Sequence, residues 1–396
     1  MNRWQTLSLG EFAESVDYGV TASAQIEPKG FKFLRITDIQ NGAVNWDTVP
    51  WCECDSKSAR EAQLQSGDIV FARTGATTGK SFLIRDCPSG AIFASYLIRV
   101  RVGENVDPSY VSHFFQTPEY WAQITSSARG VAQPGVNATT LKAIKIPLAP
   151  LAEQRRIAAI LERADALRTK RRAVLAQLDA LTDAIFLDIF GDPATNPKSW
   201  PRKTIGELAL KFSDGPFGSN LKTEDYTETG VRVVRLQNIG VGKFLDEDKA
   251  FISENHFREL RKHECRPGDV LIGTLGDPNL RACIQPNWLT IALNKADCVQ
   301  FRPDDRIASA IYICALLNHP SMGRMAQELM HGQTRVRISM GRLRDLEVPV
   351  PPGEVQRSFG IQVAASERLK TLNLAWLREA DALFDSLQWR AFRGQL

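Results

Sequence analysis

The alternation of apolar and polar positions divides the chain into short strand-like runs and a few longer helical stretches. The runs "FLRITDI", "DIVFART", "SFLIR" and "YLIRVRV" lie in the first 150 residues, between positions rich in Gly, Pro, Asn and Asp. The runs "VRVVRLQNI", "DVLIGTL" and "CVQF" lie between 200 and 352. Each region also has a helical stretch, "PSYVSHFFQTPEYWAQI" and "IASAIYICALLNHPSMGRMAQEL". These patterns predict two α/β units with mostly antiparallel strands.

A different period follows each unit and predicts a long helix. Between Leu151 and Phe190 the spacing of apolar residues alternates between four and three once Arg171 is counted, as in a coiled coil. The residues of this stripe are Ile160, Ala164, Leu167, Val174, Leu178, Leu181 and Ile185. A looser stripe in the second helix contains Phe359, Val363, Leu369, Trp376, Leu383 and Leu387. The segment "GDPATNPKSW" ends the first helix, because glycine and proline stop helices.

The two halves of the chain are copies of one plan. Equivalent positions lie 196 residues apart at Trp4 and Trp200, and 202 apart at Pro147 and Pro349. The junction "IPLAPLAEQRRI" returns as "VPVPPGEVQRSF", and each copy places prolines before a long helix. A tandem duplication with small insertions explains this drift. We expect domains at 1–150 and 200–352, helices at 151–190 and 353–396, and a linker at 191–199.

Each long helix needs a partner that buries its apolar stripe, and the other long helix is the nearest candidate. The return path through a compact unit favours antiparallel pairing, which relates the halves by a pseudo-two-fold axis. Arg171 and Asn373, which are equivalent positions near the helix midpoints, are then expected to meet.

Composition sets loose limits on partners and compartment. The chain has 396 residues, 43% of them hydrophobic, and a formal net charge of +4, which does not by itself require a polyanionic partner. Seven cysteines and no basic, apolar leader indicate free thiols in the cytoplasm. The longest apolar run, "IASAIYICALL", is too short to cross a bilayer, so no membrane association is expected.

Motifs for catalysis and metal binding are weak. "GATTGKS" has one residue too few between its glycines for a phosphate-binding loop, and we interpret it as a hairpin tip carrying a lysine. The pattern Glu-x-Lys, as in some nucleases, occurs at Glu27 and again at Glu247, a frequency that chance can supply. The pairs Cys52/Cys54 and His263/Cys265 lack zinc-site spacing. The chain is therefore expected to carry no active site and no metal.

Polar, glycine-punctuated loops with cations occur at matching places in both halves. They are "RTGATTGK" and "SARGVAQPGVNATTLK" in the first half, and "TLGDPNLR" and "MHGQTRVRISMGRLR" in the second. Their side chains are of the types that hydrogen-bond to bases and phosphates. The DNA-contact candidates are Arg73, Thr74, Thr77, Lys80, Arg129, Gln133, Asn137, Arg235, Asn238, Arg281, Gln333, Thr334, Arg335 and Arg337. A basic cluster, "RTKRR" at 168–172, could face a phosphate backbone, the solvent or a partner protein.

The whole chain resembles the DNA-specificity subunits of type I restriction-modification systems. The resemblance rests on "IPLAPLAEQRRIAAIL" before the long helix, "FGDPATNPKSW" after it, and the return at 133–147. It implies two target-recognition domains that each read half of a bipartite DNA sequence, and a coiled coil that sets the spacing. The second junction departs from the first, because Val355 stands where the first copy has Glu153.

The resemblance also implies the partners. Double-stranded DNA, two methyltransferase subunits and restriction/translocase subunits are expected, with S-adenosylmethionine, ATP and Mg bound by those subunits and no cofactor by this chain. Candidates for the coiled coil and the subunit interface are Gln154, Arg155, Ile160, Leu167, Arg171, Leu178, Gln356, Asn373 and Trp376. Two alternatives remain: an interaction scaffold whose globular units bind proteins, and a nuclease that uses Glu27 and Lys29.

Overall fold

The computed structural model describes residues 4–40, 42–127, 135–216, 220–327, 330–331 and 337–396. The chain divides into two compact units. Unit 1 contains residues 1–172 and 375–396, and unit 2 contains residues 173–374. Both units mix helices with sheets, as the strand-like and helical runs predict.

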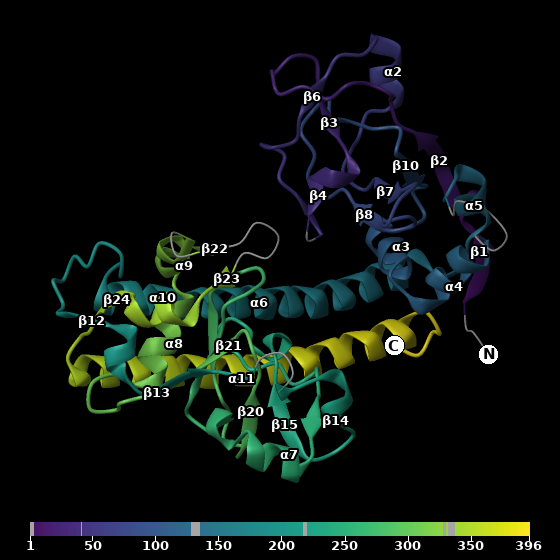
Figure 1. Cartoon of the computed structure of the whole chain (residues 1–396). Helices are drawn as coiled ribbons and strands as arrows, with labels where there is room; N and C mark the ends of the chain where they lie inside the picture. Colours follow the sequence, from purple (N-terminus) through teal and green to yellow (C-terminus); the bar gives the residue numbers. More distant parts are fainter. Residues whose placement is uncertain (1–3, 41, 128–134, 217–219, 328–329, 332–336) are drawn as a thin grey trace. The chain divides into compact units, whose positions relative to one another are not determined.

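Unit 1 is built on an antiparallel four-stranded sheet in the order β2-β10-β7-β8. A smaller sheet, β6-β3-β9, contains one parallel pair, β3 with β9, and β1 pairs with β11. In Figure 1 the strands β7, β8 and β10 lie between the region of β3 and β6 and the helices α3 and α4. The strands are β1 Gln5–Ser8, β2 Ala13–Tyr18, β3 Phe31–Leu34, β4 Ile39–Gln40, β5 Ala43–Val44, β6 Trp51–Cys52, β7 Ile69–Ala72, β8 Ser81–Leu83, β9 Ile92–Phe93, β10 Leu97–Val102 and β11 Lys145–Leu148. The short helices are α1 Leu9–Phe12, α2 Ser56–Glu61, α3 Pro108–Phe114, α4 Pro118–Ser127 and α5 Ala138–Ala143.

Unit 2 repeats this plan. Its four-stranded sheet has the order β13-β21-β18-β19, and a second sheet has the order β14-β16-β15-β20-β17. The strands are β12 Arg202–Thr204, β13 Ala209–Asp214, β14 Tyr226–Thr227, β15 Val231–Val234, β16 Phe251–Ile252, β17 Glu264–Cys265, β18 Val270–Gly273, β19 Arg281–Ile284, β20 Ala292–Asn294, β21 Cys298–Pro303, β22 Met330–His331, β23 Arg337–Ile338 and β24 Glu347–Pro349. The short helices are α7 Glu254–Glu259, α8 Ala310–Asn318, α9 Pro320–Gln327 and α10 Met340–Asp345.

The two long helices are α6, Leu151–Phe190, and α11, Gly353–Ala391 (Figure 1). The α6 helix begins directly after a proline and ends before Gly191, whose φ of 77° lies in the left-handed region that favours glycine. Each unit contains one end of each helix.

Inside each unit the two helix segments run antiparallel. In unit 1 the guanidinium of Arg168 donates to Asp381 at 2.7 Å, while earlier residues of α6 share a core with later residues of α11. In unit 2 an ion pair joins Asp179 to Lys370. The expected antiparallel pairing therefore holds within each unit.

In unit 1, the buried residues of α6 coincide only partly with the predicted apolar stripe. Ile157 and Leu161 are fully buried, and Ala164 and Arg168 continue that face, with Arg168 4.1 Å from the ring of Phe384. Leu167, which we expected in the seam, is 60% exposed. The assignment of Leu167 to the contact face of the two helices was therefore wrong.

The other candidates for the contact between the long helices or for the subunit interface differ in exposure. Ile160, Arg171 and Leu178 are of intermediate exposure, and Arg155 is exposed. Trp376 is 46% exposed, and its ring lies under the Arg171 guanidinium at 4.6 Å. Asn373 is buried and donates from Nδ2 to the carbonyl of Leu369. The expected meeting of Arg171 with Asn373 would join the two units and stays a prediction.

Each unit's core is completed by a helix end. Phe384, Ala391 and Phe392 belong to the apolar core of unit 1, and Phe186 and Phe190 belong to that of unit 2. Burial of large aromatic side chains is a major contribution to folding. Neither globular domain is therefore complete without the last turns of a long helix.

One glutamine near the start of each long helix attaches that helix to the domain before it. Gln154 accepts a hydrogen bond from the backbone N–H of Asp107 at 2.8 Å and donates to Ala149 at 2.7 Å. Gln356 accepts from the N–H of Ser309 at 2.8 Å and donates to Pro351 at 2.8 Å. Both amides are almost fully buried, so they act inside the chain. Their assignment to the coiled coil or the subunit interface stays a prediction.

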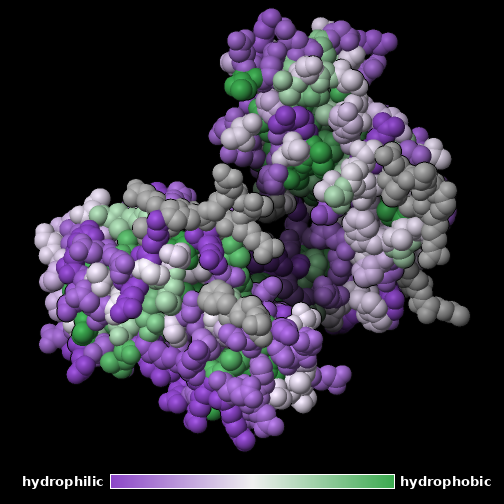
Figure 2. Space-filling model, in the orientation of Figure 1, coloured by the Kyte–Doolittle hydropathy of each residue, from purple (hydrophilic) through white to green (hydrophobic). Residues whose placement is uncertain are grey.

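Polar side chains cover most of the visible surface of the two units (Figure 2). In the part of the chain that the structure describes, no helix is both long and apolar enough to cross a membrane.

Candidate nucleic-acid interface

The loop between β7 and β8 carries the first group of candidates. Arg73, Thr74 and Lys80 are exposed, and Thr77 is of intermediate exposure. The N–H of Ala72 donates to the carbonyl of Lys80 at 2.9 Å, so the loop is a closed hairpin tip. The segment "GATTGKS" runs into strand β8 and not into a helix, which confirms the hairpin interpretation over a phosphate-binding loop.

The backbone of Arg73 is held on both sides. Its N–H donates to the carbonyl of Tyr96 at 3.0 Å, and its carbonyl accepts from Val136 at 3.0 Å. Its guanidinium lies 5.1 Å from the centre of the Tyr18 ring, a cation–π distance. The Tyr18 hydroxyl in turn accepts from the N–H of Ala138 at 3.0 Å. Three segments distant in sequence thus meet at Arg73.

Tyr18 and Tyr96 were missed by the sequence reasoning. Tyr96 is 66% exposed and Tyr18 is 44% exposed, which is unusual for large aromatic residues. Proteins that bind single-stranded nucleic acids commonly carry exposed aromatic rings beside cationic side chains. The available signal was that each tyrosine stands at one end of a strand, Tyr18 at the end of β2 and Tyr96 just before β10.

Unit 2 builds the same backbone frame. The N–H of Thr274 donates to the carbonyl of Asp297 at 3.3 Å, and the carbonyl of Thr274 accepts from Ile338 at 3.1 Å. These bonds correspond to those of Arg73 with Tyr96 and Val136. Thr274 is therefore the structural equivalent of Arg73, and Asp297 of Tyr96.

Strand registers extend the equivalence. Tyr18 pairs with Ile98 across β2 and β10, and Asp214 pairs with Val299 across β13 and β21. The frame thus carries two tyrosines and an arginine in unit 1, but two aspartates and a threonine in unit 2. The backbone is shared while the chemistry is different.

Arg281 has a structural role within unit 2, and its assignment to DNA contact stays a prediction. Its guanidinium donates to four backbone carbonyls at 2.7 to 3.0 Å, those of Leu236, Ile239, Leu275 and Pro278. A guanidinium has five N–H donors, so this one is largely saturated inside the protein. Arg281 therefore ties the segment 236–239 to the tip of the β18–β19 hairpin.

Asn238 and Arg235 also serve the fold. Asn238 is fully buried, accepts from the N–H of Arg235, and donates to the carbonyls of Leu245 and Asp248. Arg235 pairs with the carboxylate of Asp248, its Nε donating at 2.7 Å. The assignment of these two residues to DNA contact stays a prediction, although their present partners lie within the fold.

The remaining candidates divide between placed and undescribed residues. Arg337 is exposed, with its guanidinium 3.4 Å from the carboxylate of Asp297. Asn137 is exposed and caps helix α5 by accepting from Thr140 at 2.8 Å. Arg129, Gln133, Gln333, Thr334 and Arg335 lie outside the described residues.

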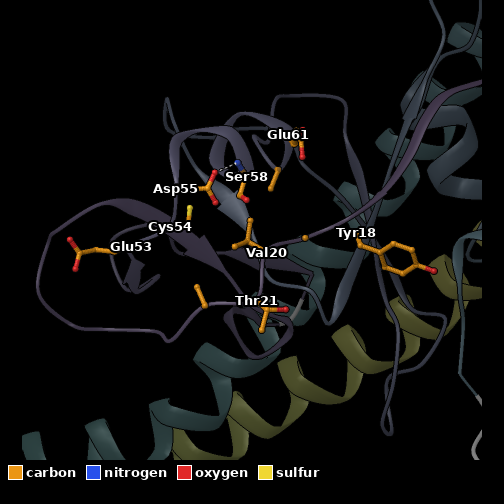
Figure 3. Close-up of a pocket in the computed structure, with 11 residues that line it drawn as sticks. Tyr18, Val20, Thr21, Glu53, Cys54, Asp55, Ser58 and Glu61 are labelled. Atoms are coloured by element: carbon orange, nitrogen blue, oxygen red, sulfur yellow. Dashed lines mark hydrogen bonds between the residues drawn. The ribbon is translucent and has the colours of Figure 1, made fainter.

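A polar recess of unit 1 has the opposite charge to the hairpin tip (Figure 3). Its lining includes Glu53, Asp55 and Glu61, and Asp55 accepts from the N–H of Ser58 at 2.9 Å. Figure 3 shows the Tyr18 ring extending away from these acidic side chains. The recess would repel phosphates, so the cationic tip is the better candidate for contact with a polyanion.

The chemical alternatives find little support in the geometry. Lys29, the lysine of one nuclease-like pattern, forms a surface ion pair with Glu53 at 2.8 Å. The described residues contain no cluster of three or more His, Cys, Asp or Glu that could hold a metal ion. Burial raises the pKa of the Cys52 thiol to about 11, which leaves the thiolate rare at neutral pH.

Comparison with known proteins finds similar proteins of one family. Residues 1–177 match the family model of the type I restriction modification DNA specificity domain. The MjaVIII type I restriction enzyme specificity subunit of Methanocaldococcus jannaschii is 22% identical, over 79% of this chain and 74% of its own length. The EcoBI specificity subunit of Escherichia coli is also 22% identical, over 78% of this chain and 70% of its own.

A solved structure shares the fold over almost the full length of both chains. It comes from work on complex assembly and conformational transition of the type I R-M system. It covers 99% of this chain and 98% of its own, at 20% identity and a TM-score of 0.62. The family model and the relatives show that this chain is similar to type I restriction-modification specificity subunits, and the solved structure shows the shared fold. The surface around Arg73 and its counterpart around Thr274 are the candidate interface in the two units.

Proposed function

We propose that this specificity subunit recognises a bipartite, asymmetric DNA target, with one half read by each unit. The observation that carries the proposal is the frame built twice, around Arg73 and around Thr274, with the same backbone bonds and different side chains. A duplicated frame supports two separate readings of DNA. Different side chains support two different half-sites.

The long helices would set the distance between the half-sites. At 1.5 Å per residue, the 40 residues of α6 extend about 60 Å. That length exceeds the ~34 Å between successive major-groove faces of a duplex. A rod of this length can hold two reading surfaces apart and leave unread base pairs between them.

We further propose that this chain is non-catalytic and cytoplasmic. Two methyltransferase subunits and restriction/translocase subunits would supply catalysis, with S-adenosylmethionine, ATP and Mg bound by them. Leu167, Trp376 and Leu383 leave apolar surface exposed on the long helices, which supports docking of such partners there. This role also explains why Leu167 lies outside the contact between the helices.

The test is to map methylated sites in a genome that carries this chain with its methyltransferase partner. We expect two short, different half-sites separated by a fixed number of unread base pairs. A continuous or strictly palindromic target would contradict the bipartite reading. Binding of the purified complex to a duplex with the mapped target should weaken as salt rises. A complex with normal partner binding but no DNA binding would instead favour the scaffold alternative.

A further inference from the structure

The frame around Arg73 supports a more specific inference, which rests on the proposed function. We propose that Arg73, whose guanidinium lies 5.1 Å from the centre of the Tyr18 ring, reads a guanine in the half-site of unit 1. Tyr18 is a positioning residue, because it acts on the base only through Arg73. Unit 2 has no equivalent of this pair, so the guanine has no symmetric counterpart in the other half-site.

The Arg73 guanidinium is available to a ligand. Several arginines of unit 1 are bound to carboxylates, including Arg99 with Asp17 at 2.5 Å and Arg101 with Asp68 at 2.8 Å. In the part of the chain that the structure describes, no ion pair to an acidic residue is found for Arg73, and the side chain is exposed. Its donors remain free for a ligand.

The Tyr18 ring restricts where the guanidinium lies. Its central carbon is 5.1 Å from the ring centre, and this cation–π contact does not use up the N–H donors as a carboxylate partner would. Guanine presents two acceptors, O6 and N7, on its major-groove edge, and the guanidinium fork matches both at once. A guanidinium already held beside a ring loses less conformational freedom when it binds. The Tyr18 ring is itself held by the bond from Ala138 to its hydroxyl.

Unit 2 carries different side chains at the equivalent positions. Thr274 has a short, buried hydroxyl in place of the fork, and Asp214 has a carboxylate in place of the ring. Asp297, in place of Tyr96, adds a second carboxylate. These side chains cannot bind guanine O6 and N7 together, because carboxylates offer only acceptors and the Thr274 hydroxyl already donates to the carbonyl of Asp297 at 3.1 Å. The difference in chemistry at one shared position makes the target asymmetric.

The experiment uses the full chain with its methyltransferase partner and compares methylation maps for variants. Arg73→Ala should make one G·C pair of one half-site degenerate, with roughly 5- to 150-fold loss of discrimination there. Arg73→Lys should also lose it, because an ammonium keeps the charge but not the fork. Thr274→Ala, the matched change in unit 2, should leave that base pair as selective as before.

Variants of Tyr18 test the positioning role. Tyr18→Ala should relax the same G·C pair, while Tyr18→Phe should relax it less, because the ring remains but loses the bond from Ala138 to its hydroxyl. Lys80→Ala is the control for phosphate contact, and it should weaken binding to all sequences without changing base preference. Urea denaturation of each variant should show that folding is intact.

The outcomes separate this inference from the proposed function. If the wild-type complex methylates no defined sequence, the proposed function fails. If it methylates a bipartite target but Arg73→Ala leaves every base pair equally selective, the guanine inference fails alone. It is also overturned if the relaxed base pair is A·T, or if Tyr18→Ala relaxes a different position from Arg73→Ala.

Discussion

The ring of Phe392, near the end of the C-terminal helix, packs against the ring of Tyr110 in α3 with centroids 5.0 Å apart. Phe190, near the end of α6, packs against Tyr312 in α8 at 4.9 Å. The two tyrosines also correspond, because each donates its hydroxyl hydrogen to a proline carbonyl at 2.6 Å. Each domain therefore has an aromatic slot, which is the space beside this tyrosine. A ring from the C-terminal end of a long helix fills it.

Truncation of this aromatic contact should be costly. Phe392→Ala removes a buried ring from the core of unit 1, and we expect a loss of about 3 to 5 kcal/mol in the free energy of unfolding. Leu383→Ala, in the preceding helix α11 but half exposed, should cost much less. Urea denaturation of the full chain measures both. Equal losses would show that the slot is not filled as described.

A fragment of residues 1–196 should dimerise. It lacks Phe392 but retains Phe190, the equivalent ring, so a second copy can fill the slot beside Tyr110 in each partner. Sedimentation should detect the dimer, and Phe190→Ala should disrupt it. Leu187→Ala, at an exposed position of the same helix, is the control.

The fragment dimer should also respond to Arg171. In an antiparallel dimer this arginine would oppose its own copy, and two like charges close together are unfavourable. Arg171→Asn should therefore strengthen dimerisation. A fragment that stays monomeric at high concentration in both forms would contradict this model of interchangeable halves.

Alanine variants of Arg281 and Lys80 should distinguish a structural cation from one that contacts DNA. They are equivalent positions, because Ser81 and Ala282 pair at the same place in their sheets. Arg281→Ala leaves four carbonyls without their donor and should cost about 1 to 3 kcal/mol in unfolding free energy. Lys80→Ala should leave stability unchanged and reduce the salt slope of DNA binding by about one. The reverse pattern would favour DNA contact by Arg281.

Stability should fall as the solution becomes more acidic than about pH 6.5. Burial lowers the pKa of His113 in the folded chain, although Glu162 and Asp165 act to raise it and Arg85 to lower it. Between its unfolded and folded pKa values the unfolded chain binds more protons, so stability is lost as the pH falls through this window.

The variant His113→Ala should make this pH dependence shallower. Only part of it should disappear, because burial also lowers the pKa of His263 and of His319. Thermal unfolding at pH 8 and at pH 5.5 is the measurement. An unchanged difference in melting temperature between those two conditions would exclude His113 as a contributor.

The sequence alone determined the class of fold, the duplication and the presence of two long helices. These features depend on local signals: prolines before each helix, Gly191 after the first, and strand-like runs repeated at a nearly constant offset. Such signals act within a few residues of the chain, so they can be interpreted without knowing what packs against what.

The tertiary structure decided which residues of those elements do which task. Leu167 and Leu175 both suit an apolar stripe, yet Leu167 is exposed and Leu175 is buried, because leucines occupy more than one face of α6 and only the partner helix selects a face. Arg281 and Arg73 both lie at hairpin tips rich in glycine. One meets four carbonyls, two of them from a distant segment, and the other meets a tyrosine ring. Those neighbours are brought together by folding, and a cation's role depends on the groups around it.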